Sequence, residues 1–248
     1  MHLVETRSQD SVTHIVLNRP NQLNALSPQL LEALIKCCGA VAESDSTVVV
    51  LSGSGSAFSA GADLPSFAQC LMGPDAHVAA DLGRRATVAL ASLPQLKIAW
   101  IDGVCVGGGL VLASACDLRW SKPHSLFSLP ELAIGIPVGW GGTARVAEIV
   151  GISRAKALTF EALPISAEAA LGMGLVSQIF DSSDAFAEAL VRLAQIPQFT
   201  LSKTMEQFDA INTQTFEPKD DAQLLVDAIN RPEIVEKLMS AWQKKSKR

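Results

Sequence analysis

The stretch Ile98–Cys116 constrains the fold of this chain more than any other part of the sequence. It reads IAWIDGVCVGGGLVLASAC, which is apolar except for Asp102 and Ser114 and is interrupted by four glycines. A membrane-spanning helix needs roughly 20 apolar residues without such turn signals. The pattern instead predicts a buried strand over 98–101, a glycine-rich connection over 103–109 and a buried helix over 110–115.

The same strand-then-helix order recurs along the chain up to about residue 180. Ser27 followed by Pro28 is a typical helix start. We expect strands near 3–7, 13–17, 47–51, 118–120, 125–128 and 175–180, and helices over 28–42, 76–91, 143–150 and 153–162. From Asp184 onward the pattern is helical. This alternation favours the α/β class with largely parallel pairing, as one core over 1–183 and a helical C-terminal region over 184–248.

Charge and cysteine usage limit the classes of function. The chain has 248 residues, a net charge of −5 and a pI near 5.4. A nucleic-acid-binding protein usually carries a basic surplus, so nucleic acid is not the expected partner. The five cysteines have neither disulfide nor metal spacing, and the four histidines are scattered. We therefore expect a reduced, cytoplasmic setting, no metal site, no signal peptide and no membrane segment.

Basic residues gather at the C-terminus, at Lys244, Lys245, Lys247 and Arg248. Such a run is either a solvated tail or a contact for phosphates or for a neighbouring subunit. The sequence leaves both interpretations open.

Two glycine-containing segments, 58–64 (FSAGADL) and 102–109 (DGVCVGGG), each follow an expected strand and precede a helix. Small residues let a ligand approach the main chain, and N–H groups at a helix start lack partners within the helix. Two such groups aimed at one point form an oxyanion hole. Either segment alone is more typical of a tight turn, but the two together favour a ligand site.

These segments belong to a longer ordered set that resembles the enoyl-CoA hydratase/isomerase, or crotonase, family. The resemblance covers roughly residues 10–180. The matching segments are NRPNQLNALS (18–27), FSAGADL (58–64), IDGVCVGGG (101–109), CDLRW (116–120), LFSLPELAIG (126–135), GGTARV (141–146) and SAEAALGMGLV (166–176).

The resemblance implies a crotonase-like spiral of ββα turns and a site for an acyl-CoA thioester. It implies an oxyanion hole made by the main-chain N–H groups of Ala60 and Gly108. The residues expected to bind the substrate are Ala60, Gly61, Ala62, Asp63, Leu64 and Gly108. The family resemblance further implies a homotrimer or a dimer of trimers, with C-terminal helices that pack between subunits and cover the active site. No cofactor is implied beyond the coenzyme A of the substrate.

The resemblance also locates two acid/base positions, of which this chain fills one. The hydratases carry a glutamate where this sequence has Val111, whereas the later glutamate is present as Glu131 in the apolar run LFSLPELAI. Adding water to a 2-enoyl thioester suits two carboxylates, but moving a double bond from C3 to C2 needs one base that transfers one proton. The sequence therefore favours a 3-enoyl-CoA to 2-enoyl-CoA isomerase with Glu131 as its acid/base group.

Three alternatives stay open at this point. One is a hydratase, a second is another crotonase reaction on an acyl-CoA, and a third is a non-catalytic family member that binds coenzyme A or RNA. Two positions also depart from the family pattern. Gln22 stands where many members have lysine, and Trp140 occupies a position that is usually small. Trp140 either fills the acyl pocket near Glu131 or packs on a neighbouring helix.

Overall fold

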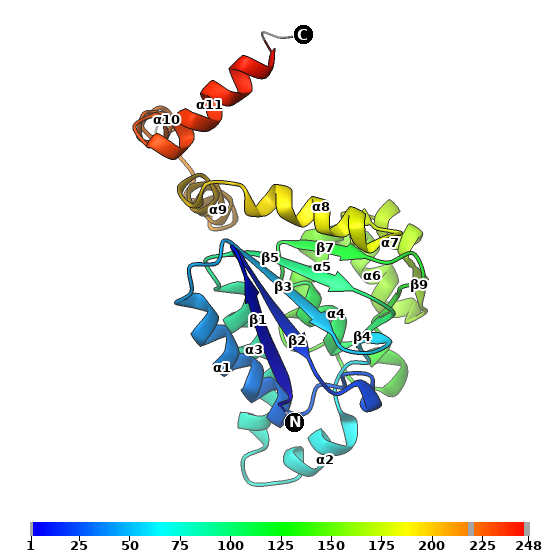
Figure 1. The fold of residues 1–248 in the computed structure, drawn as a ribbon. Helices are drawn as coiled ribbons and strands as arrows, with labels where there is room; N and C mark the ends of the chain where they lie inside the picture. The colour runs from blue at the N-terminus through cyan, green and yellow to red at the C-terminus, as the bar shows by residue number, and fades with distance from the viewer. Residues whose placement is uncertain (1, 218–220, 246–248) are drawn as a thin grey trace. The chain divides into compact units, whose positions relative to one another are not determined.

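A computed structural model describes residues 2–217 and 221–245 of the chain (Figure 1). The chain divides into two compact units, residues 1–190 and 191–248. The sequence placed the division at 183/184. It falls later because helix α8 (Ser183–Ala194) buries Ala189 and Leu190, so that its first turns belong to the first unit. Lys247 and Arg248, and the side chains of Lys244 and Lys245, lie outside the described residues.

The first unit contains a six-stranded sheet. Its order is β1 (Val4–Gln9), β2 (Val12–Leu17), β3 (Val48–Gly53), β5 (Leu96–Ile101), β7 (Leu118–Ser121) and β10 (Gln178–Ile179). Strands β1 and β2 form an antiparallel hairpin, and all the other neighbours in this sheet are parallel. The largely parallel pairing that the alternation of strands and helices predicted is therefore confirmed.

A second sheet has four short strands in the order β4 (Ala57–Ser59), β6 (Val104–Val106), β8 (Leu126–Ser128) and β9 (Ile165–Ser166). The consecutive pairs β3/β4, β5/β6 and β7/β8 each place one strand in each sheet before the chain turns into helices. The result is a spiral of ββα turns. Strand β6 lies inside the stretch 103–109 that the sequence predicted as a connection, because short strands give too little periodicity to be recognised.

The helices of the first unit cover the sheets. They are α1 (Pro28–Ala42), α2 (Leu64–Leu71), α3 (Ala76–Ala91), α4 (Gly108–Ala113), α5 (Gly142–Val150), α6 (Ile152–Glu161) and α7 (Ala167–Gly172), with 3-10 turns at η1 (Pro20–Gln22) and η2 (Glu131–Ile134). As predicted, Ser27 caps α1, and its side chain accepts the Leu30 N–H at 3.2 Å. Helix α4 is buried along its whole length and begins at Gly108, not at Leu110 as predicted.

The central strands β3 and β5 of the six-stranded sheet are buried on both faces, which is why they read as largely apolar runs. One face contributes Leu51 and Ala99 to a core shared with α1, α3 and α4. On the other face, Phe186 of α8 lies over Trp100, with ring centroids 4.3 Å apart, and meets Trp120 edge-on at 5.9 Å. This rigid core supports the loops that carry the chemistry.

The second unit consists of helices α9 (Gln198–Asn212), α10 (Asp221–Ile229) and α11 (Pro232–Lys245), in agreement with the predicted helical tail. Within it, the Arg231 guanidinium lies 3.8 Å from the centre of the Phe199 ring. The predicted break near Pro218 lies outside the described residues. Along the described ranges, no helix is both long enough and apolar enough to cross a membrane.

Candidate active site

The loop 18–27 holds the chain where it leaves strand β4. Asn24 has a left-handed backbone, with φ of +55°, and its side-chain amide donates to Ala57 O and to Ser54 O, both at 2.8 Å. The Ser59 hydroxyl in turn donates to Asn24 O at 2.9 Å. Through these hydrogen bonds, the NRPNQLNALS motif fixes the backbone where the chain enters the segment 58–64.

The same loop pairs with the main chain of residues 60–63. The Ala60 N–H donates to Leu23 O at 2.9 Å, and Gly61 O accepts from Leu26 N–H at 2.8 Å. Because its N–H is consumed in this way, the structure does not support Ala60 as an oxyanion-hole donor, which corrects the expectation from the sequence. Ala62 is different, because within the described residues its N–H makes no hydrogen bond.

Gly61 brings this segment against the glycine-rich start of α4. Its φ is +93°, and a Cβ there would lie 2.8 Å from Val106 O and 3.5 Å from Gly108 N. Only glycine satisfies both the backbone conformation and this close approach. Ala62, whose N–H is free, is therefore the next residue after Gly61, which packs against the Gly108 amide.

Gly108 is the first residue of α4, so its N–H has no acceptor within the helix. The flanking amides are satisfied, since Gly107 N–H donates to Ser128 O at 2.9 Å and Val111 N–H donates to Gly107 O at 3.0 Å. The Gly108 N–H makes no hydrogen bond with any described residue. The predicted pairing of segments 58–64 and 102–109 is thus present, with Ala62 and Gly108 as the unused donors.

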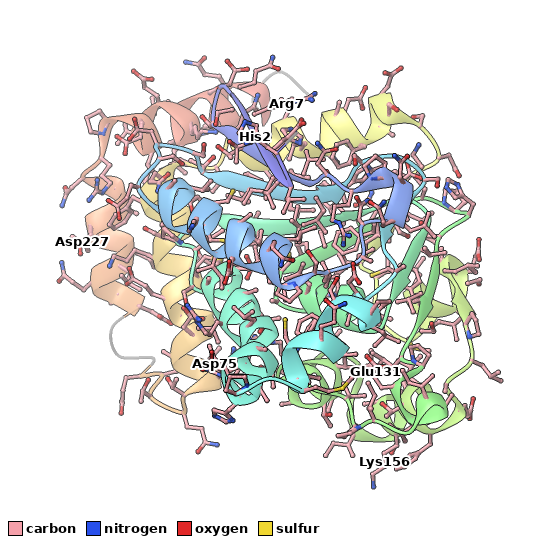
Figure 2. The ribbon with its side chains drawn as sticks, turned by 90° about the horizontal axis from the view of Figure 1, so that it is seen from below. His2, Arg7, Asp75, Glu131, Lys156 and Asp227 are labelled. Carbon is pink, nitrogen blue, oxygen red and sulfur yellow. The ribbon has the colours of Figure 1, made fainter. Side chains whose placement is uncertain are left out.

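Glu131, labelled in Figure 2, places its carboxyl group next to Gly107, the residue that precedes Gly108. It is the first residue of the turn η2, and its Oε1 lies 2.9 Å from the position that a Cβ on Gly107 would take. The buried Oε2 has no hydrogen-bond partner among the described residues. Burial raises the pKa of Glu131 above its ordinary value, and a backbone hydrogen bond offsets part of this effect. These are the properties expected of a group that transfers protons.

The surroundings of Gly142, the first residue of α5, form an apolar side of the site. Val111 is 1% exposed and fills the space next to Gly142, so that a Cβ on Gly142 would overlap the Val111 side chain. Val138 lies against the same glycine, at 3.0 Å from that position. Neither valine can hydrogen-bond a water molecule.

Trp140 completes this apolar side. A Cβ added to Gly108 or to Gly83 of α3 would overlap its indole. The ring therefore packs on a neighbouring helix, which was one of the two sequence interpretations. The other interpretation, that Trp140 fills the acyl pocket near Glu131, stays a prediction. Gly83 could not be recognised from the sequence, because it is an ordinary glycine within a helical pattern.

Asp63 and Leu64 lie where α2 begins. The Asp63 carboxylate accepts from Ser66 N–H at 3.2 Å, capping the helix, and pairs with Arg19 at 2.8 Å. Burial alone would raise the pKa of Asp63. The pKa is nevertheless below its ordinary value, because the carboxylate accepts hydrogen bonds from Arg19 and Ser66 and lies next to the charge of Arg19. These contacts give Asp63 a structural role. Leu64 is 49% exposed, and its contact with substrate stays a prediction.

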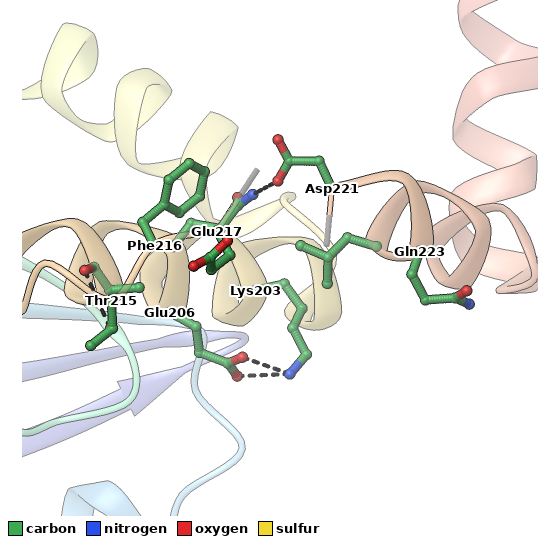
Figure 3. Close-up of a pocket in the computed structure, with 10 residues that line it drawn as sticks. Lys203, Glu206, Thr215, Phe216, Glu217, Asp221 and Gln223 are labelled. Atoms are coloured by element: carbon green, nitrogen blue, oxygen red, sulfur yellow. Dashed lines mark hydrogen bonds and ion pairs between the residues drawn. The ribbon is translucent and has the colours of Figure 1, made fainter. Parts of the chain in front are cut away.

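A cavity elsewhere in the molecule is a weaker candidate for the functional site. A cavity of about 360 Å³ lies within the second unit, between α9 and α10, where Lys203 forms an ion pair with Glu206 at 2.7 Å (Figure 3). None of the predicted site residues lines it. In the described ranges, His, Cys, Asp and Glu side chains form no group that could hold a metal ion.

Comparison with known proteins shows which family the chain belongs to. The family model for enoyl-CoA hydratase/isomerase matches residues 7–244. A Mus musculus protein named mitochondrial Delta(3,5)-Delta(2,4)-dienoyl-CoA isomerase is 34% identical over 76% of this chain, which spans 62% of that relative's length. A Clostridium acetobutylicum protein named short-chain-enoyl-CoA hydratase is 35% identical over 71% of this chain and 68% of its own length.

Among solved structures, an enoyl-CoA hydratase from Bacillus anthracis superposes with a TM-score of 0.87 at 29% identity, over 98% of this chain and 96% of its own. The predicted spiral fold is thereby confirmed. With a family model that matches nearly the whole sequence, the chain belongs to the enoyl-CoA hydratase/isomerase family of enzymes.

Proposed function

We propose that this protein is an enoyl-CoA isomerase that converts a 3-enoyl-CoA to the conjugated 2-enoyl-CoA, with Glu131 as its single acid/base group. The observation that carries the proposal is the Glu131 carboxyl group, buried beside Gly107 with one oxygen unpartnered among the described residues. The apolar residues Val111, Val138 and Trp140, which lie against Gly142 or Gly108, bear no carboxylate.

The reaction begins when the thioester oxygen accepts hydrogen bonds from the N–H groups of Ala62 and Gly108. The Glu131 carboxylate then removes a proton from C2, and the electron pair of that C–H bond delocalises through C1 to the oxygen and across C3 and C4. The two N–H groups stabilise the negative charge of this dienolate. Protonated Glu131 returns the same proton to C4, which leaves the double bond between C2 and C3. No further group is consumed.

The raised pKa of Glu131 supports this role. A carboxyl group whose pKa lies closer to neutrality is a stronger base when ionised and still gives up its proton readily. Burial favours the protonated form that must persist between the two proton transfers. Val111 supports the same reaction, because it leaves no second carboxylate to orient a water molecule.

A hydratase is the second candidate, and the similarity to the Clostridium acetobutylicum enzyme favours it. Water addition would then have to proceed with Glu131 alone. The apolar side formed by Val111 and Val138 makes that route slow, because a nucleophilic water there would lack a hydrogen-bond acceptor.

The proposal is tested by following two reactions with the same protein, namely conversion of 3-hexenoyl-CoA to 2-hexenoyl-CoA and hydration of crotonyl-CoA. We expect isomerisation to be the faster of the two and Glu131→Gln to reduce it by roughly 10²–10⁴-fold, the usual contribution of one acid/base group. Glu148→Gln, on an exposed part of α5, is the matched control. Full isomerase activity in Glu131→Gln, or hydration faster than isomerisation, contradicts the assignment.

Other properties remain predictions alongside this function. They are the homotrimer or dimer of trimers, the absence of a resident cofactor or a nucleic-acid partner, the cytoplasmic setting, and the coenzyme A contacts of Ala60–Leu64. Binding of coenzyme A without turnover on any acyl-CoA would instead support the non-catalytic alternative.

A further inference from the structure

We infer that Trp140 and Phe67 form a wall that ends the acyl site, so that the enzyme acts on short acyl chains. This inference rests on the proposed acyl-CoA function and names its substrate class. The wall separates the candidate oxyanion hole from a solvent-open cavity between α1, α2 and α3, which a longer chain would otherwise enter.

The position of the indole is the first step. Gly108 lies so close to the Trp140 ring that a Cβ would overlap it. A thioester oxygen bound to the Gly108 N–H lies about 2.9 Å from that nitrogen, so the first carbons of the acyl chain are next to the indole. The chain therefore meets Trp140 within a few atoms of the reacting centre.

The indole is also held in place. The backbone of Trp140 has a φ of +59°, a conformation that is unfavourable for a residue with a large side chain. The Thr87 hydroxyl donates to Trp140 O at 3.1 Å. Gly83 of α3 has no side chain, so the indole can pack directly against the helix. The Phe67 ring, which is 6% exposed, lies 5.7 Å from the Trp140 ring, centre to centre. Two rigid aromatic groups thus pack together at this point.

A cavity begins one helical turn beyond this pair. It has a volume of about 390 Å³ and lies between α1, α2 and α3. On α3, Ala79 lines the cavity, and Gly83, four residues later on the same face, touches the indole. On α2, Cys70 lines the cavity, and Phe67, three residues earlier, touches Trp140. One turn of helix rises about 5.4 Å, so the wall and the cavity are neighbours.

The volume of this cavity falls within the range of roughly 300–1,000 Å³ found for small-molecule sites. Its lining includes Leu82 and Val78 together with polar residues from α1. Removing the indole would therefore connect the reacting centre to a space able to receive additional methylene groups.

The experiment measures binding of saturated acyl-CoAs, which needs no turnover. Titration calorimetry would give the Kd of butanoyl-, octanoyl- and dodecanoyl-CoA for the wild type, Trp140→Gly and Phe67→Leu. Glycine suits the left-handed backbone at position 140. Trp100→Leu is the matched control, because Trp100 packs on Phe186 and not on the site.

In the wild type we expect affinity to stop rising between butanoyl- and dodecanoyl-CoA. Trp140→Gly should bind dodecanoyl-CoA roughly tenfold or more tightly than the wild type, because methylene groups become buried, with little change for butanoyl-CoA. Phe67→Leu should shift the profile in the same direction, and Trp100→Leu should leave it unchanged.

A wild-type affinity that rises steadily through dodecanoyl-CoA overturns the inference, and this measurement stands even if Trp140→Gly fails to fold. An unchanged ratio of dodecanoyl to butanoyl affinity in a folded Trp140→Gly also overturns it. If the length profile is as expected but no 3-enoyl-CoA is converted, the isomerase assignment alone fails. If no acyl-CoA binds, both fail.

Discussion

The Glu131 carboxyl group occupies the space that a side chain on Gly107 would need, with Oε1 2.9 Å from the position of that missing Cβ. Gly107 also has a φ of +52°, so two independent constraints require glycine there. The residue before the candidate oxyanion donor Gly108 therefore also sets the position of the candidate base.

Replacing Gly107 with alanine should accordingly impair catalysis more than folding. We expect Gly107→Ala to displace the carboxyl group and lower kcat by roughly tenfold or more, since a misplaced reacting group costs up to about 10²-fold. Gly174→Ala is the control, because Gly174 has a φ of +83° but nothing within 4 Å of its Cβ position. Equal kcat in the two variants would show that Gly107 has no effect on Glu131.

The rate of isomerisation should depend on pH through Glu131. The reaction needs the ionised carboxylate, so kcat/KM should fall as pH drops through the pKa of this group in the free enzyme. Because burial raises that pKa, the fall should lie above the pH range of an ordinary glutamate. A pH–rate profile checks this, and a profile that stays flat down to the pH range of an ordinary glutamate would falsify the role of burial.

The raised pKa of Glu131 should also make the stability of the folded protein depend on pH. A folded-state pKa above the unfolded value means that the folded protein binds more protons between the two values, so stability falls as pH rises through that window. In Glu131→Gln this part of the pH dependence should disappear. Urea unfolding of both proteins at several pH values measures it, and identical pH dependence in the two would contradict the raised pKa.

The choice between Ala60 and Ala62 can be tested by exchanging a single backbone amide for an ester, which deletes one N–H. At Ala62 we expect kcat to fall by about 10²–10³-fold, as for loss of one oxyanion-hole donor. At Ala60 the exchange removes the bond to Leu23 O, so it should lower stability by roughly 0.5–1.5 kcal/mol and leave kcat near the wild-type value. The reverse pattern would restore Ala60 as the donor.

Asp63→Asn should reduce stability without abolishing activity. Asparagine keeps the helix cap but leaves Arg19, whose side chain is 17% exposed, without its charged partner. A hydrogen bond to a charged group contributes roughly 1.5–3 kcal/mol. Because the pKa of Asp63 is lowered in the folded state, its contribution is present above the unfolded pKa and is lost as pH falls through the folded pKa. The difference between the two proteins should therefore shrink in acid, and Asp81→Asn, at an exposed ion pair, should show a smaller change.

Much of the fold could be predicted because its signals are local. Ser27 and Pro28 located the start of α1, and the β-branched run at 47–51 located β3, since caps and apolar periodicity act over a few residues. The short strand β6 and the start of α4 at Gly108 were missed. Their bounds depend on pairing with β4 and β8, and not on local propensity.

The sequence by itself determined that two glycine-containing segments follow strands, that Glu131 follows Pro130 in an apolar run, and that Val111 replaces a second carboxylate. The first two facts depend on residue type and spacing alone, and the third also rests on the family resemblance. Only the tertiary structure decided which amide is free, because the acceptor that takes the Ala60 N–H comes from Leu23, in a distant part of the chain. It likewise decided that Trp140 lies on Gly108 and Gly83, since a side chain's neighbours are fixed by packing between elements far apart in sequence.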